Sequence, residues 1–211
     1  MVSPQRRFLV LIGAAIVTLT GCFTGQRPTL VSESAIDDPA AKAVVERLNR
    51  ANTLDFIARY HIIPSLTGAT TEATVAQRDG RRKITIGNVE YTTDGVESQT
   101  CQNNDEGCVD FLDEAPISDL NITQGFWGPA FRSRLELDAK RRIGPSAAST
   151  TTIAGHDAVC VDVILPSVAT TTGTVVYCAL DAGVLARYFG ADVSIELVAF
   201  SREVLPTDLT G

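Results

Sequence analysis

Histidine and cysteine are the residues of this 211-residue chain that could support metal binding or nucleophilic catalysis. The chain has two histidines, His61 and His156, and five cysteines. No Cys-x-x-Cys pair occurs, and the two histidines lack the spacing of zinc ligands. Neither a Gly-x-Ser-x-Gly motif, nor a His-Glu-x-x-His motif, nor a phosphate-binding glycine loop is present. We therefore expect no metal site, no cofactor and no enzymatic activity.

Four of the cysteines have the pattern of structural disulfides. Their number is even, which is typical of two disulfides in an oxidising compartment, and three pairings are possible. The loop between Cys101 and Cys108 is polar and can turn the chain back on itself. Cys160 and Cys178 lie in apolar runs at equal distances from a turn expected near Ala169, so a hairpin would place them opposite each other. This geometry favours the pairs Cys101–Cys108 and Cys160–Cys178.

The fifth cysteine, Cys22, closes an N-terminal export signal. Arg6 and Arg7 precede the apolar stretch Phe8–Leu19, which is too short to span a bilayer comfortably. The letters LTGC that end at Cys22 resemble the bacterial lipobox, in which the thiol receives a diacylglyceryl group and the chain is cut before the cysteine. The resemblance implies lipidation at Cys22 and a place on the extracytoplasmic face of the cell membrane. The alternative is an ordinary secretory signal with a chance cysteine.

Composition predicts one acidic globular domain behind this signal. Hydrophobic residues are 45% of the chain, charged residues are 20%, and the formal net charge is −7. An acidic balance repels phosphate and argues against a nucleic-acid partner. A polar stretch without periodicity follows Cys22 and is typical of a flexible tether. We expect a signal peptide at 1–21, a lipid-anchored tether at 22–37 and a folded domain at 38–211.

The periodicity of the domain predicts two helices and many strands. Apolar residues recur at helical spacing after the Asp38–Pro39 cap, so a helix is expected to about Asn52, and a second one from Ala130 to about Arg142. Alternating segments and turn signals predict strands at 54–62, 71–77, 83–86, 89–93, 149–153, 158–165, 174–180, 184–189 and 193–204. No βαβ rhythm occurs among them. The predicted class is α+β, with a large curled antiparallel sheet of about 8–11 strands covered by two or three helices.

This order of parts resembles the LolA/LppX/LprG-type lipoproteins of bacterial envelopes. The segments that carry the resemblance are ANTLDFIARYHI, IAGHDAVCVDV, VVYCALDAGVLARY and VSIELVAFSREV, and it extends from residue 38 to about 205. It implies a half-open barrel whose hydrophobic lining receives acyl chains. The acidic balance and the two expected disulfides are departures from the best-known lipid carriers.

Two hypotheses of function follow from the resemblance. The first is a membrane-anchored protein that binds the acyl chains of a lipid or lipoglycan and helps to carry it across the envelope. The alternative is a sensory or scaffolding lipoprotein that binds a protein partner through an exposed apolar patch. The residues expected to line a lipid cavity are Phe56, Tyr60, Ile62, Ile84, Ile86, Tyr91, Trp127, Phe131, Leu135, Val161, Val163 and Val176, with Ala58 keeping space open. These side chains could equally pack against the helices and leave no cavity, and Trp127 could be a lid, an anchor or a core residue.

Overall fold

The computed structural model describes residues 36–102, 107–166 and 173–209. The predicted signal peptide, Cys22 and the predicted tether up to residue 35 lie outside the described residues, as does the turn expected near Ala169. In the part of the chain that is described, no helix has the length and apolar character needed to cross a membrane.

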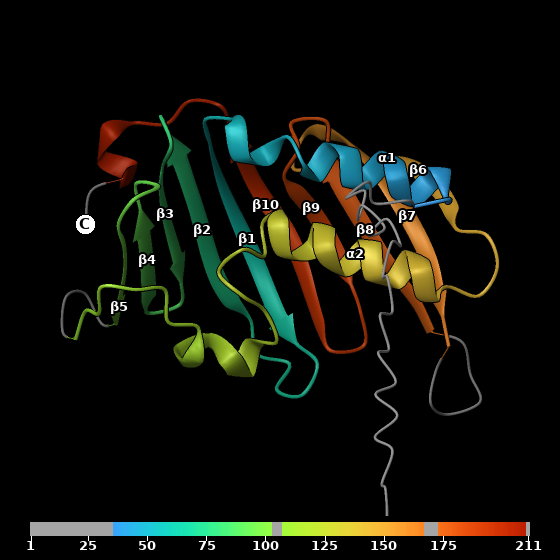
Figure 1. Ribbon diagram of the computed structural model, residues 1–211, viewed down its shortest axis with the longest axis horizontal. Helices are drawn as coiled ribbons and strands as arrows, with labels where there is room; N and C mark the ends of the chain where they lie inside the picture. The colour runs from blue at the N-terminus through green and yellow to red at the C-terminus, as the bar shows by residue number, and fades with distance from the viewer. Residues whose placement is uncertain (1–35, 103–106, 167–172, 210–211) are drawn as a thin grey trace, which may run out of the picture. The chain divides into compact units, whose positions relative to one another are not determined.

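Ten antiparallel strands form one sheet in the order β5-β4-β3-β2-β1-β10-β9-β8-β7-β6 (Figure 1). The strands are β1 (Phe56–Pro64), β2 (Thr71–Arg78), β3 (Arg81–Ile86), β4 (Val89–Thr93), β5 (Ser98–Gln102), β6 (Ala147–Ile153), β7 (His156–Leu165), β8 (Gly173–Leu180), β9 (Leu185–Phe189) and β10 (Val193–Ser201). β5 and β6 are the two edges, and within the described residues they do not pair with each other. The predicted α+β class with a large, curled and open antiparallel sheet is confirmed. The last strand is shorter than predicted, because it ends at Ser201 rather than near Val204.

Local sequence explains the strands and their turns. In β1, Phe56, Ala58, Tyr60 and Ile62 are buried while the residues between them are more exposed, as alternation along a half-buried strand requires. The β2–β3 hairpin turns at Asp79-Gly80, where both residues have positive φ (52° and 79°). Aspartate followed by glycine tolerates this backbone, which is why the pair is typical of tight hairpins.

In the described part of the chain, two α-helices and three 3-10 turns accompany the sheet: α1 (Pro39–Leu48), α2 (Pro129–Arg141), η1 (Ala51–Thr53), η2 (Ala115–Leu120) and η3 (Pro206–Leu209). Both helices were predicted, although α1 ends at Leu48 rather than near Asn52. α1 and α2 pack against each other and against β7, and they lie on one face of the sheet (Figure 1). The buried face of α2 is mostly apolar but includes the acidic residue Asp138. The Asp138 carboxylate accepts a hydrogen bond of 2.5 Å from the Tyr177 hydroxyl.

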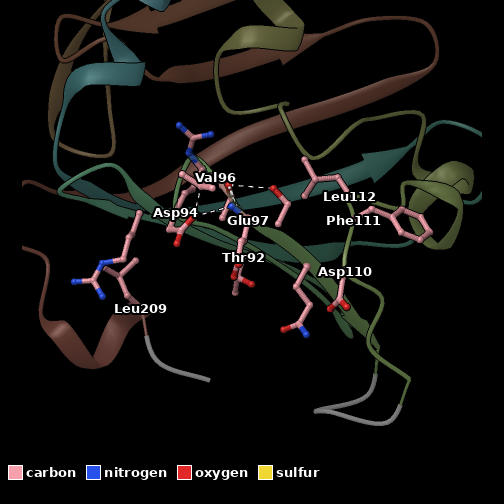
Figure 2. A pocket seen from close by; sticks show the side chains of 13 residues that line it. Thr92, Asp94, Val96, Glu97, Asp110, Phe111, Leu112 and Leu209 are labelled. Atoms are coloured by element: carbon pink, nitrogen blue, oxygen red, sulfur yellow. Dashed lines mark hydrogen bonds between the residues drawn. The ribbon is translucent and has the colours of Figure 1, made fainter.

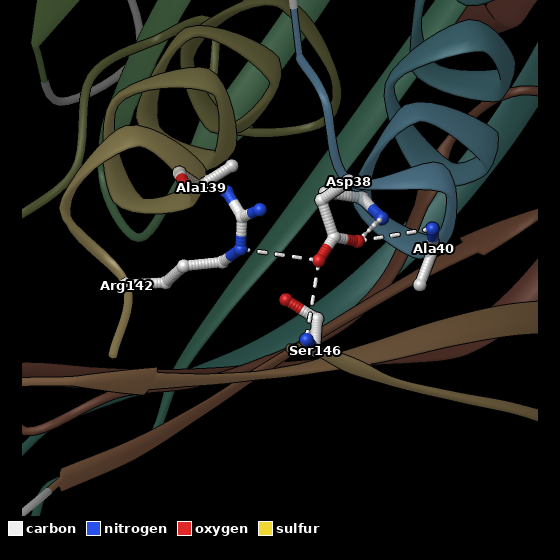
Figure 3. Close-up of polar contacts among 6 residues, drawn as sticks. Asp38, Ala40, Ala139, Arg142 and Ser146 are labelled. Atoms are coloured by element: carbon white, nitrogen blue, oxygen red, sulfur yellow. Dashed lines mark hydrogen bonds and ion pairs between the residues drawn. The ribbon is translucent and has the colours of Figure 1, made fainter. Parts of the chain in front are cut away.

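Asp38 joins three parts of the domain (Figure 3). Its carboxylate accepts hydrogen bonds from the backbone N–H groups of Ala40 and Ala41, both at 3.0 Å, and thereby caps α1. The same carboxylate accepts from the Ser146 N–H at 3.1 Å and lies 3.2 Å from Nε of Arg142. Burial alone would raise the pKa of Asp38, but these backbone donors and the guanidinium outweigh it and leave the pKa lowered. The ionised group therefore holds the start of α1 against the end of α2 and the start of β6.

Both predicted disulfides are confirmed. Cys160 and Cys178 are direct partners in the register of β7 and β8, and they are bonded to each other. Cys101, in β5, is bonded to Cys108. Next to the Cys101–Cys108 disulfide, an isolated antiparallel bridge joins Thr100 to Val109.

Candidate functional site

The predicted lipid-lining residues form most of the core. Eleven of the twelve are at most 3% exposed: Phe56, Tyr60, Ile62, Ile84, Ile86, Tyr91, Trp127, Phe131, Leu135, Val161 and Val163. Aromatic rings from the sheet and from the segments over it are in contact. Tyr60 meets Phe126 with ring centroids 5.1 Å apart, and Phe56 meets Trp127 at 5.6 Å. These side chains fill the space between the sheet and the helices.

Val176 does not belong to that set, and its prediction was wrong. In the register of β7 and β8, Val161 is opposite Tyr177 and Val163 is opposite Val175, whereas Val176 is opposite Asp162. Successive side chains of a strand point to opposite faces, so Val176 lies on the face away from Val161 and Val163, where it is only half-buried. Val175 takes the inner position.

A hollow lies elsewhere, at the end of the sheet formed by β3, β4 and β5. Its volume is about 870 Å³, and none of the twelve predicted residues lines it. Neither α-helix lies over these strands (Figure 1). Figure 2 shows Leu209 on one side of the hollow, Asp110, Phe111 and Leu112 on the other side, and the 94–97 turn between them. A smaller hollow of about 220 Å³ shares Arg81 and Leu209 with it.

The 94–97 turn is held by its own polar groups. The Asp94 carboxylate accepts hydrogen bonds from the N–H groups of Val96 and Glu97, at 2.9 and 2.8 Å (Figure 2). These bonds, led by that from Glu97, lower the pKa of Asp94 and keep it ionised. The Thr93 hydroxyl donates to the Glu97 carbonyl at 3.0 Å. The turn therefore presents Val96, an apolar side chain that is 92% exposed.

The 110–112 segment, on the other side of the hollow, is held against β5 by hydrogen bonds of Thr100. The hydroxyl of this buried residue donates to the Phe111 carbonyl at 2.8 Å and accepts from the Asp113 N–H at 2.9 Å. The Thr100–Val109 bridge and the neighbouring disulfide fix the chain just before this point. The 110–112 segment presents Phe111, a residue that is 58% exposed, beside Leu112.

Arg82 supplies a half-buried cation to the same hollow. Its guanidinium carbon lies 4.3 Å from the centroid of the Trp127 ring, and its Nε donates to Oε1 of Gln77 at 2.8 Å. Gln77 is itself fixed, because its amide nitrogen donates to the carbonyls of Ala51 and Leu54 at 3.0 and 2.7 Å. Burial lowers the pKa of Arg82. The guanidinium remains charged nevertheless, since arginine titrates far above neutral pH.

The lining of this hollow combines apolar and charged side chains. The described residues that line it include no histidine and no cysteine. In the same part of the chain, no group of three or more histidine, cysteine, aspartate or glutamate residues is placed to hold a metal ion. His61 is exposed on β1, and the exposed His156 packs edge-on against Phe200 at 5.1 Å. What the hollow offers instead is exposed apolar side chains among charges of both signs.

Comparison with known proteins finds similarity only to solved structures, two of which are described below. No family model and no curated protein matches the chain. Among solved structures, it is similar to MucB in complex with MucA(peri), at 12% identity and a TM-score of 0.47, over 81% of this chain and 59% of that one. It is also similar to the MucA/MucB complex of Pseudomonas aeruginosa, at 13% identity and a TM-score of 0.44, over 80% and 61% of the respective chains. The chain thus spans about three fifths of the length of the structures that it matches.

Proposed function

We propose that this protein is a non-enzymatic binding protein of the cell envelope that holds a segment of a protein partner in the hollow over β3–β5. The observation that carries the proposal is the lining of this hollow. Val96 and Phe111 are apolar and largely exposed, and they stand among the charged side chains of Arg81, Arg82 and Asp110. A polypeptide offers apolar and charged groups in alternation and can meet both.

The distribution of apolar surface supports a protein partner over an acyl chain. An acyl chain needs a continuous apolar lining, and the residues predicted for that lining are packed against one another in the core. The hollow has the volume of an ordinary ligand pocket, between roughly 300 and 1,000 Å³, but charged groups stand on its walls. Leaving carboxylates against hydrocarbon is costly, so this lining favours a partner that brings polar groups of its own.

The location is part of the proposal. The lipobox-like end of the N-terminal signal supports attachment through Cys22 to the extracytoplasmic face of the membrane. Two disulfides support an oxidising compartment on the same side.

Site-specific photo-crosslinking in living cells tests this function. The photoreactive residue p-benzoyl-phenylalanine would replace Phe111 or Val96 in the complete chain. A matched control would carry it at Leu66, which is 90% exposed and does not line the hollow. After irradiation, adducts of each variant would be sized on gels and identified by mass spectrometry.

We expect a polypeptide adduct at positions 111 and 96 and none of that mass at position 66. Lipid adducts at 111 and 96, without polypeptide, would overturn the proposal in favour of lipid binding. The same polypeptide adducts at all three positions would also overturn it, since the contact would not be specific to the hollow.

A further inference from the structure

We propose that Arg82 makes the hollow selective for a carboxylate, so that the partner segment carries an aspartate or a glutamate side chain at this point. This inference rests on the proposed function, because it assigns the chemistry of the segment that the hollow holds.

Arg82 differs from the other half-buried arginines of the domain. Among the described residues seven arginines are half-buried, and six of them have a carboxylate oxygen within 4.0 Å of the guanidinium: Arg47, Arg78, Arg132, Arg134, Arg142 and Arg187. Arg82 is the seventh, and no described carboxylate lies that close to it. A desolvated cation is costly unless an anion compensates it. The pattern therefore points to an anion that another molecule supplies.

The guanidinium is already positioned for such an anion. Gln77 holds Nε, and the Trp127 ring covers one face of the group, so that its orientation is set before any ligand arrives. The two terminal nitrogens have no hydrogen-bond partner among the described residues. Together they form the planar fork that binds a carboxylate through two parallel hydrogen bonds.

The acidic residues of the hollow do not take this place. Asp94 is engaged by the backbone N–H groups of its own turn. Glu97 and Asp110 line the hollow, but neither lies within 4.0 Å of the Arg82 guanidinium. Their charges repel an anion from the walls and leave Arg82 as the point where a carboxylate is favoured. A segment with a single acidic group among apolar and basic residues fits this arrangement best.

Affinity selection from a defined peptide library tests the inference. The library would contain blocked hexapeptides in which the third position is glutamate, glutamine or lysine. It would be applied to the complete chain in detergent micelles and to three variants, Arg82→Gln, Arg82→Lys and Arg59→Gln. Arg59 is exposed, lies outside the hollow and gives the same loss of charge, so it is the matched control. The best selected peptide and its glutamine counterpart would then be titrated while the fluorescence of Trp127, the single tryptophan of the chain, is recorded.

We expect the wild-type protein and Arg59→Gln to prefer glutamate over glutamine by about 10-fold or more, which is the ratio for one hydrogen bond to a charged group. Arg82→Gln should lose this preference, and Arg82→Lys should keep only part of it, because lysine has the charge without the fork. If Arg82→Gln does not fold, the affinity ratio of the glutamate and glutamine peptides for the wild-type protein and for Arg82→Lys still tests the inference.

Equal binding of the glutamate and glutamine peptides to wild-type protein would overturn the inference and leave the proposed function standing. A preference that survives in Arg82→Gln would also overturn it. Enrichment of no peptide would count against the inference and the proposed function together. Arg82-dependent binding to phosphatidylglycerol vesicles, without a peptide preference, would replace the carboxylate by a lipid headgroup.

Discussion

Replacing Gln77 by alanine is expected to destabilise the domain and to release Arg82 at the same time. Gln77 is 3% exposed and makes three hydrogen bonds: two from its amide nitrogen to the carbonyls of Ala51 and Leu54, and one from Nε of Arg82 to its amide oxygen. It therefore connects η1 to the sheet and fixes the guanidinium in the hollow. The substitution leaves two carbonyls and one cationic donor without these partners.

The magnitude follows from the three bonds. A neutral hydrogen bond contributes about 1 kcal/mol net, and one to a charged group contributes about 1.5–3 kcal/mol. Arg82 is only half-buried, so water can replace part of its bond, and we expect a loss of roughly 3 kcal/mol in the free energy of unfolding. In a domain of this length, 1 kcal/mol corresponds to about 2–4 °C in melting temperature, so the expected decrease is about 6–12 °C.

Thermal and urea unfolding of four variants, namely Gln77→Ala, Arg82→Gln, the double variant of these two and a control, would measure this effect. Gln124→Ala is the matched control, because Gln124 is half-buried and its side chain makes no hydrogen bond with the described residues, so it should change stability by less than about 0.5 kcal/mol. The double variant Gln77→Ala/Arg82→Gln should lose less than the sum of the single losses, since both remove the same bond. A decrease of 2 °C or less for Gln77→Ala, or strict additivity of the pair, would refute this account of the network.

Three further predictions concern the cap of α1, the disulfides and the anchor. Asp38→Ala should lower the free energy of unfolding by about 2 kcal/mol, since it removes a helix cap and a mostly buried ion-pair partner, whereas the exposed Glu46→Ala should change it little. The pKa of Asp38 is lower in the folded state than in the unfolded state, so its ionised carboxylate stabilises the fold fully above the unfolded-state pKa near 3.8. This stabilisation is lost as the pH falls through the folded-state pKa. The melting temperatures of the wild-type protein and Asp38→Ala should therefore converge in acid. Cys160→Ala should lower the melting temperature more than Cys101→Ala. The chain-entropy model gives roughly 3 kcal/mol for the Cys160–Cys178 disulfide, whose cysteines are 18 residues apart, and less for Cys101–Cys108, whose cysteines are 7 apart. Equal shifts in melting temperature would contradict this prediction. Cys22→Ala should abolish membrane anchoring in cell fractionation and leave the melting temperature of the domain unchanged.

The elements set by neighbouring residues could be predicted from the sequence. The cap at Asp38 and the turn at Asp79-Gly80 depend on side chains and backbone angles within a few residues of each other. The pairing of Cys160 with Cys178 could also be predicted, because the two cysteines lie at equal distances from the midpoint between two consecutive strands, and those strands pair antiparallel in that register. Val176 shows how narrow this margin is: the correct register places it opposite Asp162, and a residue chosen one position from the inner Val175 lies on the other face of the sheet.

The burial of the predicted lining could be anticipated only in part. Periodicity shows which side of each strand is apolar, and eleven of the twelve residues are indeed buried, eight of them on strands. Whether that face encloses a cavity depends on the volumes that other segments bring to it. Phe126 and Trp127 come from a non-periodic stretch, and their rings fill space beside Tyr60 and Phe56. No pattern within a single strand contains that information.

Arg82 shows both the signal that the sequence held and the point where it ended. In the run Arg81-Arg82-Lys83, strand alternation separates the middle residue from its neighbours. Arg82 therefore shares a face with the buried Ile84 and Ile86, while Lys83 lies on the other face and forms a 2.9 Å ion pair with Glu90 of β4. A cation two residues before a buried apolar pair is already a sign of an unusual environment. That no described carboxylate lies within 4.0 Å of the Arg82 guanidinium is a property of the tertiary structure, because it depends on what the 94–97 turn and the 110–112 segment place around that group. A cation that Gln77 and Trp127 hold in place, with no described carboxylate in ion-pair distance, is the feature on which the proposed carboxylate partner rests.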